Sequence, residues 1–181
     1  MKAPEGDVVG ELVAHLADPA NAEPPVSFPL EPSRADHPGL YAWWADGDGL
    51  AVLSAPFGES LGPPIYAGQT GATSTRSAKQ RSATLRSRIS ANHLNGNVAS
   101  STFRETLTAV LSAPLSLHPV APRRLDNASN RALSIWMHHY LCVAIVPFDD
   151  RDDLAAVEQA VLARLDQPLN LMGMRATTIR R

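Results

Sequence analysis

Two short segments decide the fold of this chain: GLYAWW at residues 39–44 and PIYAG at residues 64–68. Both are rich in apolar and aromatic residues and are bounded by glycine or proline, which is typical of buried β-strands. Each segment carries one tyrosine, Tyr41 in the first and Tyr66 in the second. Between them, a turn signal at Asp46–Gly49 precedes Leu50–Leu53, for which we expect a further strand.

Helical periodicity recurs on both sides of these segments. Apolar residues at helical spacing predict helices over Val8–Leu16, Ser82–Leu94, Ser101–Ser112, Asn130–His139 and Leu154–Leu165. The apolar run Tyr140–Pro147 has the β-branched character of a central strand. This order of elements predicts an α/β layer fold, in which a small central, mostly antiparallel β-sheet is flanked by α-helices.

The length of 181 residues suits one domain with a short extension. We expect residues 1–37 to form an N-terminal extension with one helix and a Pro-rich segment. The domain itself is expected over residues 38–175, with a helical insert at about residues 95–139. Cys142 stands alone, which argues against a disulfide framework and a cysteine-based zinc site. The apolar runs are too short for a membrane span, and the N-terminus has acids where a signal peptide has its apolar run, so we expect a cytoplasmic protein.

The charge is unevenly distributed along the chain. The formal net charge is -2, yet residues 76–131 contain nine basic and two acidic residues. This concentration is typical of a surface that faces phosphate, although a solvated arginine-rich helix face would give the same count. We expect phosphate contacts from five basic residues: Arg76, Lys79, Arg81, Arg86 and Arg104.

The two tyrosine segments resemble the paired GIY and YIG strands of the GIY-YIG nuclease superfamily. Three further features follow in that family's order: Arg88 in a Leu-x-x-Arg pattern, Glu158 in LAAVEQAVLARL and Asn170 in QPLNL. The resemblance is to the restriction-enzyme-like bacterial members. It implies the GIY-YIG fold and a divalent-metal-dependent endonuclease that hydrolyses DNA phosphodiester bonds, in restriction and defence or in repair.

The same resemblance implies a role for each residue. Tyr41 would be the general base, and Tyr66 a second hydroxyl that orients phosphate or water. Arg88, with Arg86 as its nearest rival, would neutralise the scissile phosphate. Glu158 would hold one Mg²⁺ or Mn²⁺ ion, with waters and a phosphate oxygen completing its coordination. Asn170 would hold the site together through amide hydrogen bonds.

Two positions depart from the family pattern. Many members have a lysine directly after YIG, where this chain has Gln69, and some have a histidine four residues after the arginine, where it has Asn92. His93 follows one step later, which on an α-helix is about 140° away from Arg88. His93 therefore reaches the site if the helix ends near Asn92, and otherwise lies on the surface. A free tyrosine, with a pKa of about 10, is a poor base, so what activates Tyr41 stays open.

Two alternative functions stay open as well: a weak or inactive GIY-YIG-fold module that binds DNA, and a nuclease that acts on RNA. A homodimer is one expectation, because a double-strand cut from one active site needs two protomers or two binding events. Trp43 and Trp44 alternate along their strand, so we expect one in the core and the other partly exposed. The acidic run Asp149–Asp153 lacks the spacing of a calcium loop and is expected to cap the following helix.

Overall fold

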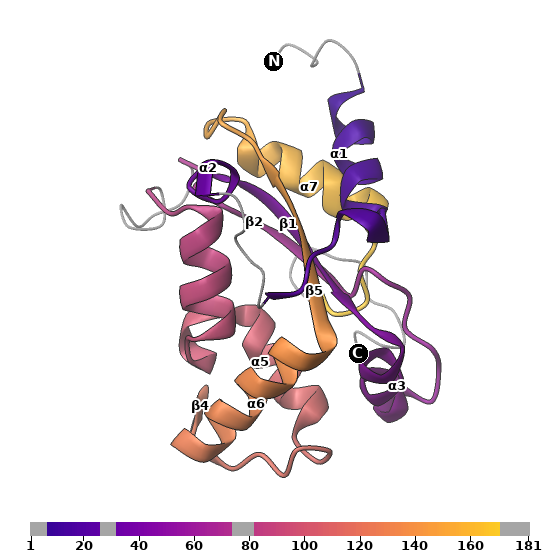
Figure 1. Ribbon diagram of the computed structural model, residues 1–181, viewed down its shortest axis with the longest axis vertical. Helices are drawn as coiled ribbons and strands as arrows, with labels where there is room; N and C mark the ends of the chain where they lie inside the picture. Colours follow the sequence, from indigo (N-terminus) through magenta and orange to yellow (C-terminus); the bar gives the residue numbers. More distant parts are fainter. Residues whose placement is uncertain (1–6, 26–31, 74–81, 171–181) are drawn as a thin grey trace.

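The structure is a computed structural model that describes residues 7–25, 32–73 and 82–170. It contains helices and short strands (Figure 1). In chain order they are α1 (Val8–Ala17), η1 (Pro19–Asn21), α2 (Pro32–Ala35), β1 (Gly39–Ala45), α3 (Gly47–Ser54), η3 (Ala55–Phe57), β2 (Tyr66–Thr70), η4 (Ser87–Leu94), η5 (Val98–Ser100), α5 (Thr102–Leu111), β3 (Pro119–Ala121), β4 (Arg124–Leu125), α6 (Asn127–Tyr140), β5 (Leu141–Pro147) and α7 (Leu154–Leu165).

A three-stranded antiparallel sheet in the order β2-β1-β5 forms the centre of the molecule. In the register, Tyr41 of β1 lies opposite Gly68 of β2 on one side and opposite Ile145 of β5 on the other. The central strand β1 is buried along almost its whole length, as its apolar sequence predicts. The predicted fold class, a small antiparallel sheet flanked by helices, is confirmed.

The two faces of the sheet carry separate apolar cores, because successive side chains of a strand point to opposite faces. Tyr41, Trp43 and Tyr66 pack on one face with apolar side chains of η4, α5 and α6. Leu40 and Ala42 pack on the other face with apolar side chains of α1 and α7. Figure 1 shows α1 and α7 together on one side of the strands and α5 and α6 on the other.

The two tryptophans do not divide between core and surface as expected. Trp43 is fully buried, and Trp44 is only 9% exposed. Trp44 faces the second core, where its indole N–H donates to the backbone oxygen of Leu16 at 3.2 Å. The expectation of a partly exposed tryptophan is wrong because α1 covers that face of the sheet.

The strand expected at Leu50–Leu53 is also wrong, since these residues lie in the helix α3. Asp46 begins this helix, because its carboxylate accepts a hydrogen bond from the backbone N–H of Gly49 at 2.7 Å. The acidic turn signal is therefore a helix cap, and Leu53 is buried on the inner face of α3. A short hairpin, β3–β4, stands in the insert where no strand was expected.

The N-terminal segment packs against the domain. Leu12 and Leu16 of α1 lie in the core shared with α7. Further along, Glu23 pairs with Val143 through two backbone hydrogen bonds of 3.0 and 2.9 Å on the outer edge of β5. The segment thus covers one face of the sheet and part of one edge, and leaves the β2 edge to other elements.

Candidate functional site

The hydroxyl of Tyr41 is the centre of a cluster of polar groups beside β2. His93 Nε2 lies 2.8 Å from Tyr41 Oη, and Arg88 Nε donates to the same oxygen at 3.3 Å. Tyr41 is only 1% exposed. Burial raises its pKa above the ordinary value of 10.0, because an ionised phenol would lose its hydration there. The Tyr41 hydroxyl therefore keeps its proton at neutral pH.

Gly68 leaves the space that the Tyr41 ring occupies. The ring crosses over the backbone of the opposite strand, and a Cβ at position 68 would lie 2.8 Å from Tyr41 Oη and 3.1 Å from Cζ. Only glycine leaves room for this approach. The glycine of the YIG-like segment is thus explained by the tyrosine of the GIY-like segment.

A π-helix brings Arg88 and His93 to the same hydroxyl. The segment Ser87–Leu94 is wound as a π-helix, and the backbone N–H of Asn95 bonds the oxygen of Ser90, five residues earlier. Hydrogen bonds in a π-helix run from residue i to i+5, so residues about five apart share a face. The helix does not end at Asn92; its wider turn carries His93 to Tyr41, where an α-helical turn would have directed it away.

His93 is fully buried between polar and aromatic neighbours. Its Nδ1 lies 2.7 Å from Ser101 Oγ. Its ring meets those of Tyr41 and Phe103 edge to face, with centroids 5.2 and 5.6 Å away. Burial, reinforced by the charges of Arg88 and Arg104, lowers the pKa of His93 well below 6.5. The imidazole is therefore neutral and offers one donor and one acceptor.

Tyr66 supplies a second hydroxyl beside the first. Its Oη lies 3.0 Å from Thr102 Oγ1, and its ring packs on Phe103 with centroids 4.6 Å apart. Burial raises the pKa of Tyr66, so this hydroxyl too is protonated at neutral pH. Ser101 and Thr102 were not assigned to the site from the sequence, where they were visible only as the start of a predicted helix.

Glu158 belongs to α7, which packs on the face of the sheet opposite to η4. The backbone N–H of Gln69 and the charge of Arg88 both act to lower the pKa of the Glu158 carboxyl. Desolvation outweighs both effects and raises the pKa of Glu158 to about 7. The side chain of Gln69 contacts the loop after β2, since its Oε1 accepts from the N–H of Ala72 at 3.3 Å. Residue 69 therefore influences the Glu158 carboxyl through its backbone N–H.

Asn170 joins the end of the described chain to β2. Its amide oxygen accepts from the N–H of Ala67, and its amide nitrogen donates to the oxygen of Ala67, each at 2.8 Å. These bonds satisfy one residue of the outer edge of β2 as a neighbouring strand would. Asn170 thereby ties the segment after α7 to the strand that carries Tyr66.

Arg88 is the partly exposed cation of the cluster. Besides Tyr41, it contacts the backbone oxygen of Ser100, 3.5 Å from Nη1. Its pKa is raised, chiefly by Tyr41, so its charge is permanent. Arg86, the alternative considered from the sequence, points elsewhere and binds Asp36, with Nε 2.6 Å from Oδ1.

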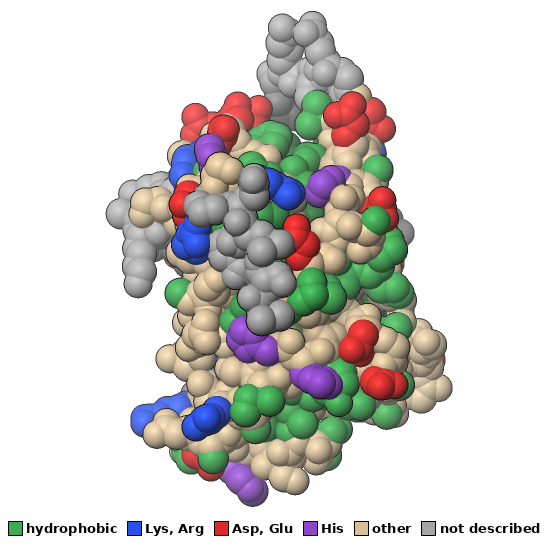
Figure 2. Space-filling view, viewed as in Figure 1, with side chains coloured by type: hydrophobic (Ala, Val, Ile, Leu, Met, Phe, Trp, Pro, Cys, Tyr) green, Lys and Arg blue, Asp and Glu red, His purple; other side chains and the backbone are tan. Residues whose placement is uncertain are grey.

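The residues expected to contact phosphate separate into different environments. Arg76, Lys79 and Arg81 lie outside the described residues. Arg104 is fully buried, so its expected phosphate contact is wrong. Exposed arginines remain on the β3–β4 hairpin, where Arg123 pairs with Glu105 at 3.0 Å. Figure 2 shows basic side chains at the surface near β4.

The donor set suits a hard cation held by few protein ligands. Among the described residues, no group of three or more histidine, cysteine or acidic side chains gathers at one point. Glu158 offers one half-buried carboxylate, whose charge contributes to the raised pKa values of Tyr41 and Tyr66. Mg²⁺ keeps several waters and is commonly bound through one or two carboxylates plus substrate phosphates, so this arrangement fits it.

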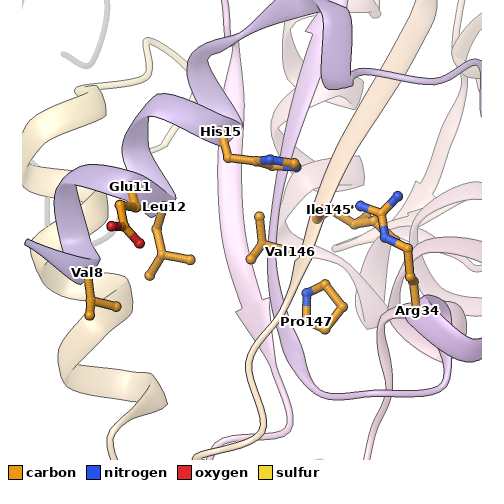
Figure 3. Close-up of a pocket in the computed structure, with 8 residues that line it drawn as sticks. All are labelled: Val8, Glu11, Leu12, His15, Arg34, Ile145, Val146 and Pro147. Carbon is orange, nitrogen blue, oxygen red and sulfur yellow. Dashed lines mark hydrogen bonds between the residues drawn. The ribbon is translucent and has the colours of Figure 1, made fainter.

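A pocket of about 270 Å³ lies against β5, on the opposite edge of the sheet (Figure 3). His15, Arg34 and Val146 are among its lining residues, and Arg34 donates to the backbone oxygen of Ile145 at 3.1 Å. None of its lining residues belongs to the Tyr41 cluster. No helix in the described part of the chain has the length and apolar character to cross a membrane.

Comparison with known proteins agrees with the geometry of the Tyr41 cluster. No curated protein and no solved structure gives a significant match. The family described as GIY-YIG catalytic domain matches residues 39–180, which include Tyr41, Tyr66, Arg88, Glu158 and Asn170. Since that match covers most of the sequence, the chain belongs to the GIY-YIG catalytic-domain family, a family of nuclease-type fold.

Proposed function

We propose that this protein is a divalent-metal-dependent endonuclease that hydrolyses phosphodiester bonds in DNA. One observation carries the proposal: the Tyr41 hydroxyl has a cation, Arg88, and a neutral imidazole, His93, within hydrogen-bond distance. Hydrolysis of a phosphodiester needs a base for water, a positive charge for the phosphate and protonation of the leaving oxygen. The first two requirements have candidates within this cluster.

A proton path starts at Tyr41. Because its pKa is raised, Tyr41 can take a proton from water only while it gives up its own. His93 Nε2 is the acceptor 2.8 Å away, provided that Nδ1 carries the ring proton and donates it to Ser101. Water then loses its proton to Tyr41 Oη as Tyr41 passes its proton to His93. The hydroxide attacks phosphorus, the bond to the leaving oxygen breaks, and that oxygen takes a proton from solvent.

His93 is suited to relay a proton and not to retain it. The low pKa caused by burial, Arg88 and Arg104 makes the protonated ring short-lived. After the bond has broken, His93 returns its proton to Tyr41 as Tyr41 releases one to solvent, which restores the starting state. In this proposal the proton acceptor for Tyr41 comes from η4, so the reaction needs no lysine at position 69 of β2.

Arg88 and Glu158 would hold the reacting phosphate from two sides. Arg88 is partly exposed, so its guanidinium would pair with a non-bridging oxygen. Glu158 would hold Mg²⁺ or Mn²⁺, and the bound ion would supply positive charge to the phosphate and to groups that lose protons. Ionised Glu158 is favoured above pH 7, and the charge of the ion would extend that range downward.

The experiment that tests the proposal is cleavage of supercoiled plasmid DNA by the full-length protein. We expect nicking or cutting with Mg²⁺ or Mn²⁺ and none with EDTA. Arg88→Ala and Glu158→Gln should lose activity by roughly a hundredfold or more. Arg164→Ala and Glu59→Gln change the same residue types at exposed positions and should cut like the parent. Cleavage that survives both site substitutions would refute the assignment.

The choice of DNA over RNA follows from the family resemblance, so the substrate needs its own comparison. Duplex DNA, single-stranded DNA and a structured RNA, each end-labelled and tested in parallel with Mg²⁺, separate the possibilities. Preferred cutting of duplex DNA supports the proposal. Faster cutting of the RNA would contradict the proposal that DNA is the substrate. Salt-sensitive DNA binding without cleavage under any divalent metal would indicate the inactive binding module instead. Methylated and unmethylated duplexes then test a role in restriction, in which modification should protect.

A further inference from the structure

Arg104 is a buried cation outside the proposed reaction. It is 0% exposed and lies near the N-terminus of α5. Its guanidinium joins the end of η4 to α6 through hydrogen bonds of 2.8 to 3.1 Å. The acceptors are the backbone oxygens of His93, Leu94 and Asn130 and the side-chain oxygens of Asn130 and Ser134.

No carboxylate pairs with this cation among the residues that the structure describes. Burial lowers the pKa of Arg104 only to about 10, so it is charged at neutral pH. The last carbonyls of a helix carry partial negative charge, and a cation there is favourable. His93 and Leu94 are the last residues of η4, so the end of the π-helix compensates the charge of Arg104.

Arg104 also acts on His93 through its backbone. Its N–H donates to Ser101 Oγ at 3.0 Å, and the same oxygen lies 2.7 Å from His93 Nδ1. The side chain of Arg104 holds the His93 carbonyl at 2.8 Å. Residue 104 therefore contacts His93 directly at the main chain and, through Ser101, at the ring.

We propose that Arg104 is a positioning residue that holds the end of the π-helix and thereby sets the His93 ring against Tyr41. The catalytic consequence rests on the proposed nuclease function, whereas the positioning does not.

The charge of Arg104 has a second effect, on the protonation of His93. The titratable and charged groups that face His93 are Tyr41 from β1, Tyr66 from β2, Arg88 from η4 and Arg104 from α5. Two of these are cations, and both favour the neutral imidazole.

Substitution of Asn130 tests the role of the charge without removing Arg104. Asn130→Asp places a carboxylate where the amide oxygen accepts from Arg104 Nη2 at 2.8 Å. Asn130→Ser is the matched neutral control, because both substitutions remove the amide N–H that donates to Gly96. Nitrogen NMR of the His93 ring measures its protonation from pH 8 down to the lowest pH at which circular dichroism shows the protein still folded.

We expect His93 to gain a proton at higher pH in Asn130→Asp than in the parent, and Asn130→Ser to behave like the parent. The acidic side of the pH–rate profile for cleavage should move to higher pH in Asn130→Asp as well. If the His93 signals and the pH–rate profile of Asn130→Asp match those of the parent, the charge effect is refuted. The NMR measurement tests the charge effect even if the parent cuts no nucleic acid. A failure of the proposed nuclease function is therefore distinguished from a failure of the charge effect.

Arg104→Lys tests the positioning. Lysine keeps the charge but lacks the planar fork that bridges η4 and α6. We expect kcat to fall about tenfold with KM unchanged, and the ring resonances of His93 to move. Arg104→Met should lose more of kcat than Arg104→Lys, because it leaves the carbonyls of η4 without their donor. Parent-like kcat and His93 signals in Arg104→Lys would overturn the positioning role.

Discussion

His93 Nε2 lies 2.8 Å from the hydroxyl of Tyr41, a residue 52 positions earlier in the chain. The contact pairs a neutral imidazole with a phenol that keeps its proton, and Arg88 donates to the same oxygen. In the proposed reaction, Tyr41 would pass its proton along this hydrogen bond as it takes one from water.

His93→Gln should keep the fold and remove the proton relay. Glutamine can hydrogen-bond Tyr41 but cannot take its proton, so we expect kcat to fall by about 10² to 10⁴ with little change in KM. Single-turnover cleavage at saturating enzyme measures the chemical step. His118→Gln, at an exposed position, is the control and should cut like the parent. Parent-like cleavage by His93→Gln would exclude His93 from the reaction.

Gly68→Ala should displace the Tyr41 ring. The added Cβ would lie 2.8 Å from Tyr41 Oη, and an overpacked core costs about 1–3 kcal/mol. Urea unfolding measures the stability, and the cleavage assay measures the accompanying loss of activity. Gly62→Ala is the matched control, since no atom lies within 4 Å of a Cβ there. Equal stability and activity of the two variants would contradict the close approach of Tyr41.

Glu158→Gln should stabilise the metal-free fold at alkaline pH. The pKa of Glu158 is raised from 4.5 to about 7, so burial favours the protonated carboxyl. That contribution to stability is present at low pH and is lost as the pH rises through about 7. The free energy of unfolding of the variant should exceed that of the parent on the order of 2 kcal/mol at pH 8, and the difference should shrink as the pH falls toward 4.5. Denaturant unfolding in EDTA measures this, and a difference independent of pH would argue against a buried carboxyl.

Asn170→Ala should weaken the β2 edge. It removes both hydrogen bonds to Ala67 and leaves buried backbone groups without partners, which costs about 1–3 kcal/mol. Amide hydrogen exchange should accelerate at Ala67 before it changes in β5. Asn127→Ala, at an exposed position of α6, serves as the control. Unchanged protection of Ala67 would show that Asn170 does not hold this strand.

Local patterns determined much of the fold. The apolar segments around Tyr41 and Tyr66 predicted β1 and β2, and the periodicity of Leu154–Leu165 predicted α7 with the bounds observed. These elements follow from the spacing of neighbouring side chains, which sequence displays directly. The order of motif residues also identified the family, because it does not depend on how the elements pack.

Only the tertiary structure decided where the polar side chains meet. Periodicity assumed α-helical spacing for η4, and the π-helical turn that carries His93 to Tyr41 has no local signature that distinguishes it. Arg104 has the sequence context of a solvated arginine, yet it is buried against carbonyls of η4 and α6. The burial and hydrogen bonding of these two residues depend on segments distant in the chain. The sequence therefore determined the family and the strands, and the packing of η4, α5 and α6 decided which side chains Tyr41 contacts.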